Sequence, residues 1–274
     1  MKAGLRSAIM LAAAALSLVA GPAKADPAEI QIVTQSFAPL QWDNAGKPDG
    51  YVTAYMLEVA RRVGETIPLK IGAYEFLPWK RAMLLAETMP NVLFFSLSRT
   101  PEREDKFIWL GEVSPYGQNF YQLSTRPKIE ADTVEDLRDQ KVRIGVQDGS
   151  NLLSHLKQLG FEKTGNLVPI TDFHQGIEML YLERIDVLPL TGFLAEASAC
   201  KQGYDGSLLQ PVVFVEALAN PLWAVFSQGT DPALVEAFRQ EMSALKDSGF
   251  LDAQTRAHQV NWQTLACGAL TAGK

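Results

Sequence analysis

The chain has 274 residues, of which 47% are hydrophobic and 20% are charged. These proportions are typical of globular proteins and exclude a disordered chain or one embedded in a bilayer. Acidic side chains outnumber basic ones by 31 to 25, so the formal net charge is −6. Nucleic acids and anionic membranes attract basic proteins, and neither is expected as the main partner.

The N-terminus has the pattern of a secretory signal peptide. Lys2 and Arg6 precede an apolar run from Ile9 to Ala20, and Ala23-Lys24-Ala25 follows as a small-x-small cleavage site. The apolar run is shorter than the roughly 20 residues that span a bilayer. The sequence therefore predicts cleavage after residues 1–25 and export of the remaining chain.

Cys200 and Cys267 are the only cysteines. In an oxidising, exported compartment a pair of cysteines is compatible with one disulfide. Two free, partly buried thiols fit the sequence equally well, so both alternatives stay open.

From Ile30 onward, short β-rich runs alternate with helical periodicities, which is typical of strand–helix–strand units around a mostly parallel sheet. In the first half, the expected strands are Ile30–Thr34, Leu69–Ala73 and Val92–Phe95, and the expected helices are Val52–Val63 and one that Pro78 opens.

The second half repeats this alternation. Its expected elements are the strands Val142–Val146 and Ile185–Leu190 and the helices Ser150–Leu159, Phe173–Leu182 and Gly192–Lys201. The last expected helix has Asp231 as its N-cap, Pro232 at its first position and Gly249 after its end. Two α/β units are predicted, joined through the extended stretches 114–124 and 211–226.

Enzyme and metal signatures are missing from the sequence. His155, His174 and His258 lie far apart, with no metal-ligand spacing between them or the cysteines. There is no nucleophile elbow, phosphate-binding lysine loop or dinucleotide fingerprint. We therefore expect neither a metal nor a cofactor, and the sequence disfavours the hydrolase, NTPase and dehydrogenase classes.

The segment 94–104 leads a buried apolar strand directly into hydroxyls and arginines. Ligands bind at the carboxyl ends of strands in open α/β sheets. There the Arg103 guanidinium could take a carboxylate bidentately, with Ser96 and Ser98 supplying further donors. A helix cap followed by a solvated charged face is an alternative of about equal weight.

A second polar turn, 145–151, also joins a strand to a helix. Free backbone N–H groups at such a helix start attract anions. Ser150 either caps this helix or donates to a ligand, and by itself the cap is the stronger reading.

Aromatic residues are the third feature that could form a pocket. Phe37 and Trp42 lie in a turn after the first strand, where a ring could stack on a ligand. Tyr116 lies in a connecting stretch. Trp79 shares the apolar face of its helix, and its periodicity favours core packing over ligand contact.

Together these motifs resemble the bacterial extracellular solute-binding proteins of family three, the polar amino-acid type. The likeness rests on the signal peptide and on the segments 37–39, 46–51, 77–82, 96–103, 142–150 and 183–186, which span nearly all of the exported chain.

The resemblance implies a type II periplasmic-binding-protein fold, in which two α/β lobes are joined by two hinge strands and close over a ligand. The first lobe would comprise residues 26–116 and 219–265, the second lobe 117–218, and a C-terminal tail 266–274. It also implies a periplasmic monomer that delivers a small molecule to an inner-membrane ABC permease.

In that family a Ser-x-Ser run and a following arginine hold the carboxylate, which matches Ser96, Ser98 and Arg103 here. Ser150 corresponds to a hydroxyl at the start of the second-lobe helix, and Phe37 to an aromatic residue that stacks on the ligand.

Thr191 departs from the family pattern. Amino-acid binders carry an acidic residue at this position, which pairs with the ammonium group of the ligand. A neutral hydroxyl cannot replace that charge-assisted bond. The expected ligand is a carboxylate-bearing amino acid or related compound, with Asp148 or Asp172 as possible substitutes for the acid. A dehydratase-like enzyme on this scaffold and a sensor for a membrane receptor are the alternatives.

Overall fold

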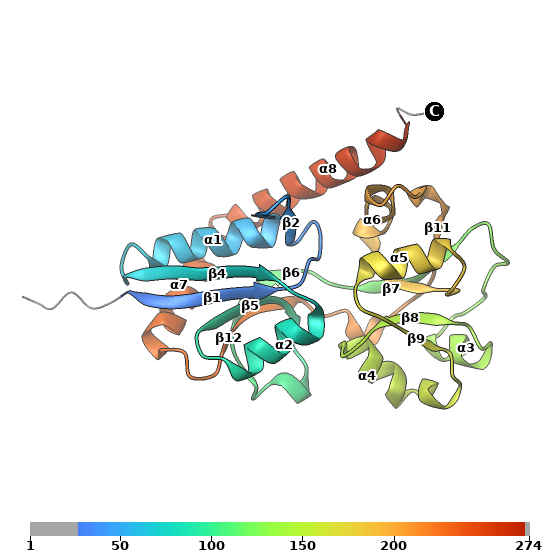
Figure 1. The fold of residues 1–274 in the computed structure, drawn as a ribbon, viewed down its shortest axis with the longest axis horizontal. Coiled ribbons are helices and arrows are strands. Elements are labelled where there is room, and N and C mark those ends of the chain that lie inside the picture. Colours follow the sequence, from blue (N-terminus) through green and yellow to red (C-terminus); the bar gives the residue numbers. More distant parts are fainter. Residues whose placement is uncertain (1–26, 272–274) are drawn as a thin grey trace, which may run out of the picture.

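The computed structural model describes residues 27–271, which form two α/β lobes lying side by side (Figure 1). The predicted signal peptide lies outside these residues. Within the described range, no helix is long and apolar enough to cross a membrane.

The first lobe is built on a five-stranded sheet in the order β4-β1-β5-β12-β6. β1 runs parallel to β4 and β5, whereas β12 runs antiparallel to β5 and β6. The strand bounds are β1 (Ala28–Thr34), β4 (Leu69–Phe76), β5 (Val92–Ser98), β6 (Phe107–Ser114) and β12 (Leu222–Ser227). A small hairpin of β2 (Trp42–Asn44) and β3 (Lys47–Asp49) follows β1.

Helices cover both faces of this sheet. α1 (Tyr51–Val63) and α7 (Pro232–Asp247) pack on one face, and α2 (Trp79–Thr88) packs on the other. In β5, Leu93 and Phe95 join the cluster under α1 and α7, while Phe94 joins the cluster under α2. Because both faces are covered, every residue of β5 is buried, and its first four residues are a continuous apolar run.

The second lobe contains the antiparallel order β10-β7-β11 and the parallel pair β8-β9, linked by a bridge between Ile144 and Val187. The strand bounds are β7 (Gln118–Leu123), β8 (Ile144–Gln147), β9 (Leu167–Ile170), β10 (Leu188–Thr191) and β11 (Leu209–Phe214). The helices are α3 (Val134–Asp139), α4 (Asn151–Gln158), α5 (Phe173–Tyr181) and α6 (Ala195–Lys201).

The chain crosses between the lobes twice. It leaves the first sheet at the end of β6 and enters β7, and it returns from β11 into β12. Because the returning chain starts β12 at the cleft, β12 runs against its neighbours, and the expectation of mostly parallel sheets is only partly correct. The exact lobe boundaries stay a prediction.

The expected helix at Asp231 is present as α7, capped by the Asp231 carboxylate, which accepts from the Ala233 N–H at 2.7 Å. It is not the last helix, as we expected it to be. α8 (Phe250–Thr271) follows and includes most of the stretch assigned to the tail. The expected strands and helices before α7 all occur, with ends shifted by a few residues.

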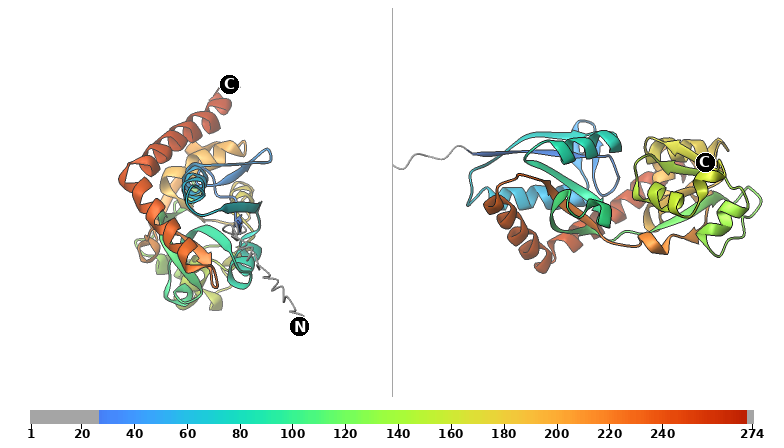
Figure 2. Two further views of the ribbon diagram at one scale, coloured as in Figure 1. Left: turned by 90° about the vertical axis from the view of Figure 1, so that its left-hand side faces the viewer. Right: turned by 90° about the horizontal axis from the view of Figure 1, so that it is seen from below.

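α8 starts on the first lobe beside α1 and α7 and extends over α6 of the second lobe (Figures 1 and 2). A disulfide joins Cys267 of α8 to Cys200 of α6, which decides between the two alternatives for the cysteines. α8 is therefore a strap that is covalently attached to both lobes.

Candidate functional site

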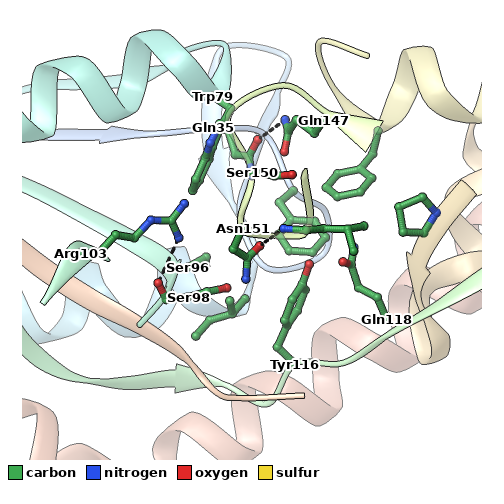
Figure 3. Close-up of a pocket in the computed structure, with 15 residues that line it drawn as sticks. Gln35, Trp79, Ser96, Ser98, Arg103, Tyr116, Gln118, Gln147, Ser150 and Asn151 are labelled. Carbon is green, nitrogen blue, oxygen red and sulfur yellow. Dashed lines mark hydrogen bonds between the residues drawn. The ribbon is translucent and has the colours of Figure 1, made fainter. Parts of the chain in front are cut away.

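A cavity of about 40 Å³, here called the first cavity, lies where the two lobes meet (Figure 3). The first lobe contributes the end of β5, the short 3₁₀ turn Pro101–Arg103 and the start of α2. The second lobe contributes the turn between β8 and α4 and the start of α5. The polar residues that line the cavity are Gln35, Ser96, Ser98, Arg103, Tyr116, Gln118, Gln147, Ser150 and Asn151.

Arg103 is the charged group of this cavity and is only 9% exposed. Its Nη1 donates to the Ser98 carbonyl at 3.1 Å, and its guanidinium lies 5.5 Å from the centre of the Trp79 ring. No described carboxylate forms an ion pair with it. Burial lowers the pKa of Arg103, but an arginine stays charged at neutral pH. The cavity therefore holds a buried cation whose charge is not neutralised by an ion pair, and such a group favours an anion.

A β-bulge lies at Ser96. Phe95 pairs with Ala224 and Leu97 pairs with Trp223, so Ser96 is the extra residue, and it has a left-handed φ of 63°. Its hydroxyl donates to the Gln41 side-chain carbonyl at 2.7 Å. A bulge re-aims the residues that follow it. This local geometry brings both Ser96 and Ser98 to the cavity wall.

The N-terminus of α4 forms part of the opposite wall. The Ser150 hydroxyl accepts from the Leu153 N–H at 3.1 Å, so Ser150 caps the helix and also lines the cavity. Asn151 lines the cavity beside it (Figure 3). Asn151 Oδ1 and the Ser150 hydroxyl accept from the N–H groups of Leu152 and Leu153, so this helix end adds partial positive charge through its dipole on the side of the cavity that belongs to the second lobe.

Aromatic rings enclose the first cavity. Trp79 is 7% exposed and packs edge-on against Phe94, as its periodicity predicts, yet it also lines the cavity. Phe37 stacks on Phe173 with ring centres 5.4 Å apart and meets Tyr116 edge-on. Burial raises the pKa of the Tyr116 phenol well above its usual range, so the phenol stays protonated.

Three contacts hold the lobes together across the cleft. Trp79 Nε1 donates to the Gly149 carbonyl at 3.1 Å, and Gln147 Nε2 donates to Gln35 Oε1 at 2.9 Å. Lys80 forms an ion pair with Asp148. The lobes are thus in direct contact, and the site is drawn from both of them.

A second cavity of about 320 Å³ lies between the lobes and adjoins the first, sharing Phe37 and Phe173 as walls. The structure divides the predicted site residues between the two cavities. Ser96, Ser98, Arg103 and Ser150 line the first, Trp42 and Thr191 line the second, and Phe37 lines both.

Sequence reasoning assigned no binding role to the polar lining residues Gln35, Gln118, Gln147 and Asn151 or to Phe173. Gln147 and Asn151 lie within the predicted polar turn 145–151 and Gln35 directly follows a predicted strand, so their place at strand and helix ends was the available signal. Gln118 gave no such signal, because its place at the cavity depends on how the chain crosses between the lobes.

The first cavity has few described side chains that could act as a general acid or base or bind a metal ion. Among the described residues that line the first cavity, there is no aspartate, glutamate or histidine. In the part of the chain that the structure describes, no cluster of three or more histidines, cysteines or acids could hold a metal ion.

No family model and no curated protein matches the sequence. Solved structures do match. One is an amino acid ABC transporter substrate-binding protein from Streptococcus pneumoniae bound to L-arginine, with 16% identity and a TM-score of 0.69 over 85% of this chain and 95% of that one.

Two other structures share the architecture. A histidine kinase sensor domain with similarity to periplasmic binding proteins has 16% identity and a TM-score of 0.69 over 85% of this chain and 96% of that one. An ancestral amino acid-binding protein, a precursor of cyclohexadienyl dehydratase, has 16% identity and a TM-score of 0.65 over 84% and 94%.

At these identities the likeness shows the fold. The two lobes, the double crossing and the match over almost the full length of each neighbour agree with the sequence resemblance. The chain has the two-lobed α/β fold of the periplasmic substrate-binding proteins, and its structural neighbours include the amino-acid-binding components of ABC transporters.

Proposed function

We propose that this protein is a periplasmic solute-binding protein that closes its two lobes over a small, polar, carboxylate-bearing compound and delivers it to an inner-membrane ABC permease. The observation that carries the proposal is Arg103, a buried guanidinium in a cavity between two lobes that forms no ion pair with a described carboxylate, although the charges of Glu87 and Glu102 act on it. A ligand carboxylate supplies the direct ion pair.

The groups around Arg103 favour an anion over a neutral ligand. Ser98 and Ser150 supply hydroxyls from opposite lobes, and the α4 N-terminus adds the positive end of its helix dipole. A carboxylate that accepts from both lobes bridges them, and its binding energy is then available only in the closed form. This coupling makes hinge closure depend on the ligand.

The cavity favours binding over catalysis. Proton transfer needs a positioned group with a pKa near the operating pH. Of the described residues that line the first cavity, only Tyr116 and Arg103 titrate, and both stay protonated at neutral pH. One structural neighbour is a precursor of a dehydratase, but such a reaction would find no general base in the first cavity and would have to use Asp43 or His174 in the second.

A ligand sensor for a membrane receptor is the second candidate, because the same fold occurs in a histidine kinase sensor domain. The binding chemistry is shared, and the receiving membrane protein differs. Uptake of a radiolabelled ligand into vesicles that contain an ABC permease and its ATPase supports transport. Closure without uptake supports sensing.

The test uses Arg103→Gln in the exported protein, stripped of ligand by reversible unfolding. A thermal-shift screen against amino acids, opines, dicarboxylates and small peptides identifies a ligand for the unaltered protein. In the variant, we expect the Kd of that ligand to rise by about a hundredfold or more, because a buried, hydrogen-bonded charge pair is lost.

Arg99→Gln is the matched control. Arg99 lies on the same segment but pairs with Glu104 and stacks against Trp109 and Trp223. Its substitution should leave the Kd within about twofold, since it removes no lining group of the first cavity. Equal affinities in the Arg103 variant and the unaltered protein would refute the carboxylate assignment.

A further inference from the structure

The second cavity is apolar over most of its wall. It is bounded by the Phe37–Phe173 stack, by Trp42 and by Leu190, and α8 closes it with Trp262. Its volume of about 320 Å³ exceeds the roughly 150 Å³ cavity that is known to take up benzene in an engineered core. The cavity is therefore large enough for a ring and its substituents.

Three residues that line this cavity each carry a buried polar side-chain atom with no hydrogen-bond partner among the described residues. The atoms are Thr191 Oγ1, Gln202 Oε1 and Trp262 Nε1. Thr191 and Trp262 are only 5% and 9% exposed. Buried polar groups are normally satisfied, so unpartnered atoms on three lining residues of one cavity indicate a ligand that supplies the missing bonds.

Whether each of these atoms is a hydrogen-bond donor or acceptor indicates which ligand group would pair with it. The indole N–H of Trp262 is a donor only, so it requires a ligand acceptor. The Gln202 carbonyl oxygen accepts, and the Thr191 hydroxyl does either. The matching ligand group carries one acceptor and at least one donor, as a secondary amide does.

The charges around the cavity favour a neutral group over a free ammonium group. The one carboxylate among its described lining residues, Asp43, is exposed and accepts from the Gly46 N–H at 2.6 Å. Lys201 brings a positive charge to 6.0 Å from the centre of the Trp262 ring. An ammonium in the apolar interior of the cavity would have no buried carboxylate beside it, which is costly, whereas a neutral amide would not need one.

We infer that the second cavity binds the acylated end of an N-acylated amino acid, whose carboxylate lies at Arg103 in the first cavity. The amide N–H donates to Thr191 or Gln202, the amide carbonyl accepts from Trp262, and the acyl group fills the apolar space. The two cavities share Phe37 and Phe173, so one molecule that passes these rings reaches both. This inference rests on the proposed function and specifies its ligand class.

The experiment measures the Kd of three matched probes by calorimetry on the exported, disulfide-bonded protein. N-benzoylglycine carries the carboxylate, the amide and a ring. Glycine lacks the acyl group, and the methyl ester of N-benzoylglycine lacks the carboxylate. We expect N-benzoylglycine to bind at least about tenfold more tightly than either of the other two.

Thr191→Val tests the cavity with almost no change in volume. It removes the hydroxyl, and we expect the Kd of N-benzoylglycine to rise by about fivefold to tenfold while that of glycine stays unchanged. Trp262→Phe, which removes the N–H and keeps a ring, should act in the same direction. Thr230→Val is the control, because Thr230 is equally buried but lines neither cavity.

The outcomes separate the two proposals. If unacylated carboxylates bind in an Arg103-dependent way and no acylated probe binds better, the proposed function stands and the inference is wrong. If N-benzoylglycine and its ester bind equally well and depend on Thr191 alone, the second cavity is a site and the role of Arg103 is wrong. Unchanged Kd values in both cavity variants, each with a normal melting temperature, would mean that the cavity holds only water.

Discussion

Ser96 has a left-handed backbone conformation inside a fully buried strand, where such a conformation is unfavourable for any residue except glycine. Its hydroxyl compensates by donating to buried Gln41 Oε1. Strain of this kind persists where surrounding contacts fix it, and it gathers at functional sites. The bulge it creates is what turns the end of β5 toward the first cavity.

Two substitutions of Ser96 separate the hydrogen bond from the backbone strain. Ser96→Ala removes the bond and keeps the strain, so we expect the free energy of unfolding to fall by about 1–3 kcal/mol. Ser96→Gly also removes the bond but relieves the strain, so it should be about 1 kcal/mol more stable than the alanine variant. Urea unfolding of both variants measures the difference. Equal stabilities would show that the bulge imposes no strain.

The residue scale is also where sequence reasoning was least complete. The hydroxyls and Arg103 were recognisable because they follow a buried apolar run. The bulge was not, because Ser96 carries none of the glycine signal that usually marks a left-handed residue. Thr191 and Trp42 were predicted to share a site with Arg103, and they line the second cavity, which adjoins the first at Phe37 and Phe173.

Among the elements, the helix and strand cores follow from periodicity and capping. α1 has the expected buried face and is followed by Gly64, and α4 and α5 begin after capping residues Ser150 and Asp172. α8 was missed because its two faces differ little in polarity. It is held by packing against three other helices and by the disulfide, which are contacts between distant parts of the chain.

The disulfide between α6 and α8 is expected to stabilise the protein substantially. It closes a separation of 67 residues, so replacing both Cys200 and Cys267 by serine should lower the free energy of unfolding by about 2–4 kcal/mol. Thermal melts with and without reductant check this. The serine variant is its own control, because reductant should not alter its melting temperature. An unaltered protein whose melt ignores reductant and whose two thiols both titrate would contradict the bond.

The whole molecule depends on two crossings of the chain and on contacts across the cleft. The two-lobed fold was predictable, because the motif order spans the chain and resembles a known family. How closely the lobes approach was not predictable, since the hydrogen bonds from Trp79 to Gly149 and from Gln147 to Gln35 form only in the folded molecule.

A charge exchange across the cleft tests the contact between the lobes. Lys80→Glu places a second negative charge beside Asp148, and we expect the affinity for a carboxylate ligand to fall by about threefold to tenfold, because closure becomes less favourable. Adding Asp148→Lys to the variant should restore the affinity. Small-angle scattering should show a larger radius of gyration for the single variant only.

The matched control is Lys246→Glu, which breaks an ion pair with Glu112 inside the first lobe. This change should leave both the affinity and the scattering unaltered. Failure of the exchanged pair to recover would indicate that Lys80 and Asp148 do not act on closure through their charges.

The strap formed by α8 also makes the opening of the molecule asymmetric. One edge of the cleft is fastened by a covalent bond, so the lobes cannot separate there as freely as at the edge where α2 faces α4 (Figure 1). The disulfide removes some of the open arrangements of the unliganded protein. Ligand binding then restricts fewer arrangements, so less conformational entropy is lost on binding. We therefore expect a solute to enter the cleft at the α2–α4 edge, where the lobes can separate most.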